Sequence, residues 1–339
     1  MNAKIKRAIK RVLRGMTSST NTAGSTQGPS PLQVYTGYEE SDFSCIKKFA
    51  TCKATTDASH YADGFGVKTL YECVPFVTPG TLDAGRLEFP VPDDGFHAEA
   101  IEYIALTDAL QRALGGASFC AVEVGAGWAP WITAAGVIAR RQGFGTIKLA
   151  GVEASAQRFP LMRLHLETNG LRPPGIDTGD AEHNGILTRL FNGAIWTHDG
   201  EIWFPDSDVA DMGAAATTTD SSTDYRGTRA DHRAVPCKRL DTLLSDFERI
   251  DFMHIDIQGA ELDLLQDQID WVTHHVRALM IATHSRVIEG RLIDLLFAHG
   301  WRLHREKPCR VDWTRTGDLV GRTLVDGSQY WLCPETSVA

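Results

Sequence analysis

Acidic residues and glycines gather at the ends of two apolar runs in the middle of the chain. Glu123, Gly125 and Gly127 stand where FCAVEVG gives way to a helical pattern. Glycines at a strand-to-helix turn let the backbone bend tightly and approach a ligand. Glu153 lies at the end of the next apolar run, TIKLAGVEA, where an acid can accept hydrogen bonds from both hydroxyls of a ribose. Together these residues suit NAD or S-adenosylmethionine.

The first turn departs from the pattern that binds dinucleotides. A GxGxxG or GxGxxA fingerprint needs a small residue at its sixth position, and here Pro130 stands there. Proline suits the first turn of a helix, but it leaves the packing role of the third glycine unfilled. Trp128 and Trp131 add flat apolar surfaces that suit a nucleoside or a substrate better than a pyrophosphate. The alternative is an ordinary glycine turn of an α/β protein.

A second group of polar residues lies in RLDTLLSDFERIDFMHIDIQGAELDLL, residues 239–265. Asp256 ends an apolar strand pattern, where a carboxylate is costly unless it is paired or used. Glu261 falls in the first turn of the following helix, a place that the helix dipole favours for any acid. His284 ends the run ALMIATH, and its ordinary pKa near neutrality suits a general base. The alternative role for His284 is a hydrogen bond to a loop backbone.

Strand-like and helix-like segments alternate from residue 97 onward and would position these residues. The strand patterns cover 119–125, 146–154, 186–196, 250–257 and 276–284. The helical patterns cover 97–114, 131–143, 156–170, 237–247, 260–272 and 290–301. Such alternation predicts βαβ units with a mostly parallel sheet that is covered on both faces. We therefore expect a Rossmann-like α/β fold, whose ligands bind at the carboxyl ends of the strands.

The ordered set of motifs resembles the FkbM family of S-adenosylmethionine-dependent methyltransferases. The resemblance is carried by VEVGAGWAPW (122–131), by residues 239–265 and by ATHSRVIEGRL (282–292), with shorter stretches at 64–76, 96–103, 300–301 and 326–334. It covers nearly everything after residue 60. It implies a class I methyltransferase fold with a mostly parallel seven-stranded sheet, a mixed α/β extension before it, and S-adenosylmethionine as the cofactor.

The resemblance also implies a role for individual residues. Glu123 would orient the glycine loop or the amino group of the cofactor, and Glu153 would clasp the ribose. Asp256 would stand between the cofactor's amino group and the substrate, so that Asp256 and His284 are the expected catalytic residues. The other expected cofactor contacts are Gly125 and Gly127 under the methionine part, Asn192, Gly193 and Ala194 beside the adenine, and the adjoining residues Ala126, Trp128 and Ala154. Apart from the resemblance, His97 and Glu99 are second candidates for the charged methionine end of the cofactor, with helix capping as the alternative.

Asp256 and His284 could instead hold a divalent cation that activates a diol. The adjacent acids typical of such sites are missing after residue 284, so we expect no metal ligand. The chain also differs from its relatives at Ala129, where glycine is frequent, and in a long insertion at 206–232, a candidate lid over the acceptor.

These features predict an O-methyltransferase that acts on a hydroxyl of a saccharide, a glycolipid or a related natural product. One alternative is a degenerate methyltransferase fold that serves as a docking module. The other is an NAD-dependent oxidoreductase, which Pro130 and the 239–265 segment disfavour.

The charge is divided unevenly along the chain. There are 34 lysines and arginines against 43 acids, yet residues 1–16 contain six basic residues and no acid. The acidic remainder argues against a nucleic acid partner. Residues 1–16 read as a basic amphipathic helix and 17–31 as a flexible linker, so this end would dock on anionic lipid or a partner protein, or stay solvated. We expect an extension with a lead-in helix over 32–110 and the methyltransferase domain over 111–339.

The cysteines and the apolar runs bear on location. The seven cysteines form no CxxC pair, which favours a reducing compartment over a disulfide framework. The longest apolar runs are far shorter than the ~20 residues of a membrane-spanning helix. We expect a cytoplasmic protein, with docking at the inner membrane through residues 1–16 as its link to lipid.

Overall fold

The computed structural model describes residues 37–87, 99–175, 178–220, 230–314 and 322–334. The predicted basic helix and linker lie outside these residues, as does His97. Residues 36–339 form a unit of their own, which contains the described part of the predicted extension together with the predicted methyltransferase domain. Among the helices that the structure describes, none has the length and apolar character of a membrane span.

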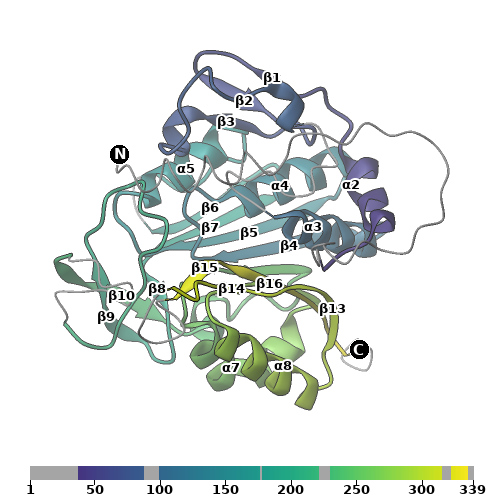
Figure 1. Ribbon diagram of the computed structural model, residues 1–339. Coiled ribbons are helices and arrows are strands. Elements are labelled where there is room, and N and C mark those ends of the chain that lie inside the picture. The colour runs from purple at the N-terminus through teal and green to yellow at the C-terminus, as the bar shows by residue number, and fades with distance from the viewer. Residues whose placement is uncertain (1–36, 88–98, 176–177, 221–229, 315–321, 335–339) are drawn as a thin grey trace. The chain divides into compact units, whose positions relative to one another are not determined.

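An eight-stranded sheet forms the centre of this unit (Figure 1). From edge to edge its strands are β13 (Arg302–Lys307), β16 (Gly327–Leu332), β12 (Ala278–Thr283), β11 (Phe252–Ile255), β4 (Ser118–Val124), β5 (Thr146–Glu153), β7 (Ile186–Asn192) and β6 (Gly179–His183). The strands from β12 to β7 are parallel, whereas β16 runs antiparallel between β12 and β13. This order is the class I methyltransferase arrangement, so the expected fold is confirmed. The antiparallel edge strand β6 adds an eighth strand.

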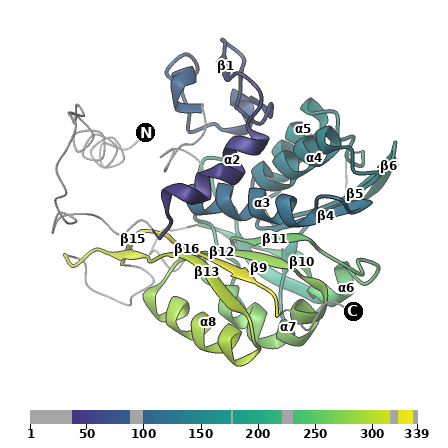
Figure 2. The ribbon, with the colours of Figure 1, turned by 90° about the vertical axis from the view of Figure 1, so that its right-hand side faces the viewer.

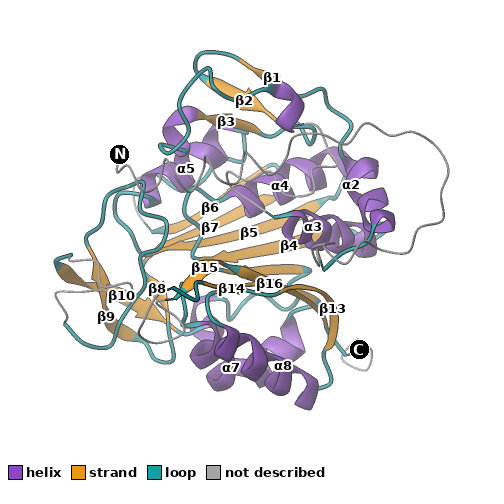
Figure 3. Ribbon diagram, in the orientation of Figure 1, coloured by secondary structure: helices purple, strands orange, loops and turns teal. Residues whose placement is uncertain are grey.

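Helices cover both faces of the sheet (Figures 2 and 3). One face carries α3 (Ala100–Ala113), α4 (Pro130–Gln142) and α5 (Phe159–Thr168), and the other carries α6 (Leu240–Leu243), α7 (Glu261–His275) and α8 (Arg286–Ala298). Successive residues of a strand point to opposite faces. Accordingly β11 packs Phe252 into the core under α3 and α4, and Met253 and Ile255 into the core under α7 and α8.

The remaining elements are short. The extension contains η1 (Glu40–Asp42), α2 (Phe43–Phe49), η2 (Tyr71–Cys73), η3 (Ala84–Leu87) and the antiparallel strands β1 (Thr55–Thr56), β2 (His60–Ala62) and β3 (Lys68–Leu70). It is tied to α5 by hydrogen bonds between the Asn169 amide and the Lys68 backbone and by a 3.0 Å contact between His165 Nε2 and Thr69 Oγ1. Two further small sheets consist of β8 (Ala194–Ile195), β10 (His232–Lys238) and β9 (Gly200–Pro205), and of β14 (Arg310–Val311) and β15 (Thr323–Val325).

Two predicted elements have different bounds in the structure. The strand predicted over 186–196 is divided at Gly193 into β7 and β8, because the chain leaves the main sheet there. The helix predicted over 237–247 is wrong at its start, since Cys237 and Lys238 end β10 and pair with β8. Only Leu240–Leu243 are helical. Both differences come from pairing within the small sheet, which joins segments far apart in the sequence.

The backbone at Gly125 lies so close to the backbone of Asp256 that no side chain fits there. The stability cost of adding a side chain can be tested. Its φ is 78°, and a Cβ there would lie 1.7 Å from the Asp256 carbonyl oxygen. Gly143 has a similar φ of 81°, but a Cβ there meets no heavy atom within 4 Å. We expect Gly143→Ala to cost about 1–2 kcal/mol of unfolding free energy, from the left-handed backbone alone. Gly125→Ala should cost at least about 2 kcal/mol more, because overpacking against backbone is added.

Urea unfolding of both variants, followed by circular dichroism, measures this difference. Equal losses of stability in the two variants would show that the loop after β4 does not lie against Asp256.

Candidate active site

A cavity of about 560 Å³ opens at the carboxyl ends of β4, β5, β11 and β12. This is the edge of the sheet at which ligands of doubly wound folds bind. The volume lies in the range of small-molecule and cofactor sites. Of the expected cofactor contacts within the described residues, the lining includes Glu99, Glu123, Gly125, Ala126, Gly127, Trp128, Glu153, Ala154, Gly193, Ala194 and Asp256. The expected base His284 lines it as well.

Glu123 supports the start of α4, directly after the loop that contains Gly125 and Gly127 (the glycine loop). Its carboxylate accepts hydrogen bonds from the amides of Trp131 and Ile132, at 3.1 and 2.9 Å. Pro130 precedes them and has no amide hydrogen, so the first turn of α4 is satisfied by this one side chain. Burial raises the pKa of Glu123 well above its ordinary value, although both amides oppose the shift. Of the two roles expected for Glu123, the contacts match orientation of the loop.

Glu153 joins the glycine loop to the end of β5. One carboxylate oxygen accepts from the Gly127 amide at 2.7 Å, and the other accepts from the Ser155 amide at 2.6 Å. Arg158 Nε lies 3.6 Å from the second oxygen. Because a carboxylate has about four acceptor positions, these contacts leave capacity for ribose hydroxyls. Glu153 therefore lines the cavity in a fixed orientation that suits the predicted role.

The three residues expected beside the adenine separate in the structure. Gly193 and Ala194 line the cavity. The Asn192 side chain donates to the Glu153 carbonyl at 2.8 Å and is not part of the lining that the described residues form. Asn192 therefore holds β7 against β5, and its contact with adenine stays a prediction.

Asp256, His284 and Glu261 form a chain of polar contacts that leads from the cavity into the core. The Asp256 side chain is 35% exposed, and its Oδ1 lies 3.3 Å from His284 Nε2. His284 Nδ1 lies 2.9 Å from Glu261 Oε1, in a fully buried carboxylate. Nε2 is itself shielded from solvent and has no hydrogen-bond partner among the described residues. Asp256 is therefore the member of the chain that faces a ligand, with His284 next to it.

The charges in this chain shift two pKa values in opposite directions. Burial alone would lower the pKa of His284, but the flanking carboxylates of Glu261 and Asp256 outweigh it and raise that pKa well above the ordinary value. Burial alone would raise the pKa of Asp256, but the close contact with His284 Nε2 and the positive charge of that ring lower it. Near neutral pH the pair is an imidazolium beside a carboxylate. The unprotonated imidazole forms as the pH rises.

The same three residues also bring ligand atoms for a cation within 4.8 Å of one another. Glu261, however, already accepts from the Ile257 and Gly259 amides and from His284. That leaves one atom each from Asp256 and His284, and the raised pKa of His284 favours the imidazolium, which has no lone pair for a cation. The geometry fits a proton-handling group better than a metal centre.

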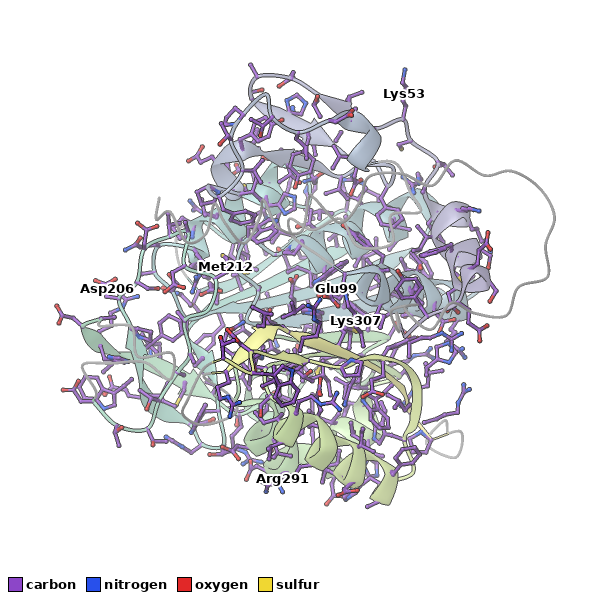
Figure 4. The ribbon with its side chains drawn as sticks, viewed as in Figure 1. Lys53, Glu99, Asp206, Met212, Arg291 and Lys307 are labelled. Atoms are coloured by element: carbon purple, nitrogen blue, oxygen red, sulfur yellow. The ribbon has the colours of Figure 1, made fainter. Side chains whose placement is uncertain are left out.

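Glu99 is engaged by two neighbouring residues, Glu102 and Lys307. It begins α3 through a capping box with Glu102. Its carboxylate also lies 2.9 Å from Lys307 Nζ on β13, and the two side chains are labelled together in Figure 4. Glu99 thus lines the cavity as half of an ion pair, and its contact with the cofactor stays a prediction.

Part of the predicted insertion adjoins the glycine loop. Met212, Gly213, Ala214 and Ala216 line the cavity, and Met212 is labelled in Figure 4. A Cβ on Gly127 would meet Met212 Cε at 3.0 Å. Arg158 donates a hydrogen bond to the Asp211 carbonyl, which ties the insertion to the residues after β5.

Several lining residues were not identified from the sequence. They are Glu102, Arg158, Met212, His254 and Asp326. Glu102 and His254 belong to a regular helix and a regular strand, and nothing in their local pattern distinguishes them from structural residues.

Comparisons with known proteins agree with the resemblance noted in the sequence. Residues 195–303 match the model of the methyltransferase FkbM domain. A protein of Jannaschia sp. (strain CCS1) named "Putative methyltransferase" is 29% identical over 273 residues, which are 78% of this chain and 90% of the relative. The FkbM resemblance is thereby confirmed, and the comparisons support methyltransferase activity.

Solved structures were also compared. The METTL16 MTase domain has a TM-score of 0.35 and 13% identity, over 67% of this chain and 64% of that one. Precorrin-6y C5,15-methyltransferase from Geobacter metallireducens GS-15 has a TM-score of 0.36 and 11% identity, over 70% of this chain and 90% of that chain.

The position of Glu153 predicts a loss of cofactor affinity when it is removed. Glu153→Ala should weaken the binding of S-adenosylhomocysteine by about 2–5 kcal/mol, as loss of charge-assisted hydrogen bonds to the ribose would. Glu182→Ala, at an exposed residue of β6, is the matched control and should bind normally. Titration calorimetry measures both. Unchanged affinity in a folded Glu153→Ala protein would remove Glu153 from the ribose site.

Proposed function

We propose that this methyltransferase transfers the methyl group of S-adenosylmethionine to a hydroxyl oxygen of a saccharide, a glycolipid or a related natural product. The observation that carries the cofactor assignment is the charge of the cavity. Its described lining contains six carboxyl groups, from Glu99, Glu102, Glu123, Glu153, Asp256 and Asp326. The cations of that lining are Arg158, its one arginine or lysine, and the His284 imidazolium. Burial raises the pKa of Glu123 and of Asp326, so the excess of negative charge is smaller than the count of six but keeps its sign.

Such a cavity favours a cationic ligand over an anionic one. S-adenosylmethionine carries a sulfonium and an ammonium group against one carboxylate, so its net charge is positive. NAD carries a pyrophosphate, whose charges would be repelled by nearby carboxylates in a partly buried site. Arg158 is held by Glu153 and by the Asp211 carbonyl, so it is not free to compensate. The charge therefore disfavours the alternative of an NAD-dependent oxidoreductase.

Methyl transfer from a sulfonium is an in-line displacement. The acceptor oxygen forms a bond to the methyl carbon while the carbon–sulfur bond breaks, and its electrons stay on sulfur as the thioether of S-adenosylhomocysteine. Holding the two reactants in line supplies much of the rate. In this chain the glycine loop, fixed by Glu123 and Glu153, would hold the cofactor. Asp256, which faces the cavity, would accept a hydrogen bond from the acceptor hydroxyl.

The hydroxyl proton must also leave as the new bond forms. We assign it to His284 Nε2, by way of the Asp256 carboxylate 3.3 Å away. Glu261 on the opposite ring nitrogen stabilises the imidazolium that results. A positioned base of this kind is typically worth 10²–10⁴-fold in rate.

Features at the mouth of the cavity support a polyhydroxylated acceptor. Asp326 and Gln258 offer acceptors for hydroxyl hydrogens, and Leu324, which is 53% exposed, offers an apolar surface. Met212 and its neighbours in the insertion lie against the glycine loop, which supports the predicted role of this segment as a lid over the acceptor.

The raised pKa of His284 predicts a pH-dependent rate. Since only the unprotonated imidazole can take the proton, turnover should rise with pH through a pKa above the ordinary value of about 6.5. His284→Gln should lower turnover by about 10²–10⁴-fold and remove this rise, while S-adenosylhomocysteine binds almost normally. Transfer of labelled methyl from S-adenosylmethionine to a panel of glycosides and glycolipids, each assayed from pH 6 to 10, measures both effects.

A stability measurement tests the same group without any acceptor. A histidine whose pKa is raised on folding stabilises the protein fully below its unfolded pKa, and this contribution is lost as the pH rises through the folded pKa. The wild type should therefore lose up to about 1.4 kcal/mol per pH unit relative to His284→Gln above pH ~6.5. Parallel pH profiles of the two proteins would contradict the charge state assigned to His284.

A further inference from the structure

A second buried pair of a carboxylate and an imidazole lines the cavity, apart from Asp256 and His284. Glu102, in the first turn of α3, places Oε1 3.0 Å from Nε2 of His254 on β11. His254 precedes Asp256 by two residues, so both side chains leave the same face of the strand, with His254 one step deeper. Glu102 is 9% exposed and His254 is 3% exposed. The cavity thus extends to a negatively charged floor between α3 and β11.

The contacts of this pair leave acceptor capacity unused. The second oxygen of Glu102 accepts from the Glu99 amide at 2.7 Å, and each carboxylate oxygen can accept a further hydrogen bond. Because the carboxylate only accepts, His254 Nε2 carries the hydrogen of this contact. Nδ1 is buried and has no hydrogen-bond partner within the part of the chain that the structure describes.

Glu102 differs in this respect from Glu99, the acid expected at the charged end of the cofactor. The Glu99 carboxylate is neutralised by Lys307 at 2.9 Å. No lysine or arginine pairs with Glu102 among the described residues, and its charge contributes to the raised pKa of Glu123. A buried carboxylate that pairs with no lysine or arginine of the described residues and keeps acceptor positions suits a ligand group that brings both a positive charge and hydrogens.

We infer that Glu102, held in place by His254, binds the α-ammonium group of the cofactor. This inference rests on the proposed function, since it names the partner of one end of S-adenosylmethionine. The ammonium group supplies three hydrogens and a full charge, and the Glu102 carboxylate supplies the opposite charge at the floor of the cavity. His254 acts as a positioning residue, because it fixes the orientation of the carboxylate.

A pair of ligands isolates this contact. S-adenosylhomocysteine keeps the amino-acid end of the cofactor, whereas 5′-methylthioadenosine shares its adenosine and thioether but lacks that end. Glu102→Gln removes the charge while keeping the shape, and glutamine at this position still completes the capping box of α3. We expect the variant to bind S-adenosylhomocysteine about 10–100-fold more weakly, and 5′-methylthioadenosine within about threefold of the wild type, by titration calorimetry.

Three further variants serve as comparisons. Glu99→Gln, three residues away, changes the other acid expected at this end of the cofactor. It should alter the ratio of the two affinities less than Glu102→Gln does, since the charge of Glu99 is already paired with Lys307. Glu153→Ala should weaken both ligands alike, because both carry the ribose. His254→Gln, which keeps an amide near the position of Nε2, should retain most of the S-adenosylhomocysteine affinity that His254→Phe loses.

The outcomes separate the inference from the function on which it rests. If Glu102→Gln weakens both ligands equally, or if Glu99→Gln has the larger effect on S-adenosylhomocysteine, the inference is wrong while the cofactor assignment stands. If the wild-type protein binds neither ligand, the proposed function fails, and the inference fails with it.

Discussion

One fully buried carboxylate, Glu261, ties together the segments that form the reactive edge of the sheet. It accepts hydrogen bonds from the Ile257 and Gly259 amides and contacts Nδ1 of His284. A buried carboxylate is costly unless such partners satisfy it. The turn after β11, the start of α7 and the end of β12 must therefore meet at one point. This constraint fixes the separation of Asp256 and His284, and it holds Gln258 in a left-handed conformation, with a φ of 57°, that a loop would otherwise avoid.

Buried acidic side chains also bind backbone amides at the ends of β4 and β5. Glu123 receives two amides of the first turn of α4, and Glu153 receives the amides of Gly127 and Ser155. Each side chain thus positions backbone around the cavity and at the same time adds an acidic group to its lining. The side chains that hold the loops are therefore also part of the surface that a ligand meets. This is the basis of the proposed preference for a cationic cofactor over a pyrophosphate.

The sequence predicted the fold because its signals are local. Alternating apolar runs and amphipathic helices gave the strands and helices of the main sheet, and the glycine turn and Glu153 were placed correctly at its carboxyl edge. The features that were missed depend on distant pairing. Cys237 joins a strand because β10 pairs with β8 and β9, and Glu99 is neutralised by Lys307 from the far end of the chain. Glu261 could not be distinguished from an acid at an ordinary helix start, since its partner His284 lies 23 residues away.

The central claim is that the cavity is built for the positively charged cofactor S-adenosylmethionine. Calorimetric titration of the wild-type protein with S-adenosylhomocysteine and, separately, with NAD tests it most directly. We expect saturable binding of one S-adenosylhomocysteine per chain and no measurable heat from NAD under the same conditions. Binding of NAD in preference to S-adenosylhomocysteine would contradict it.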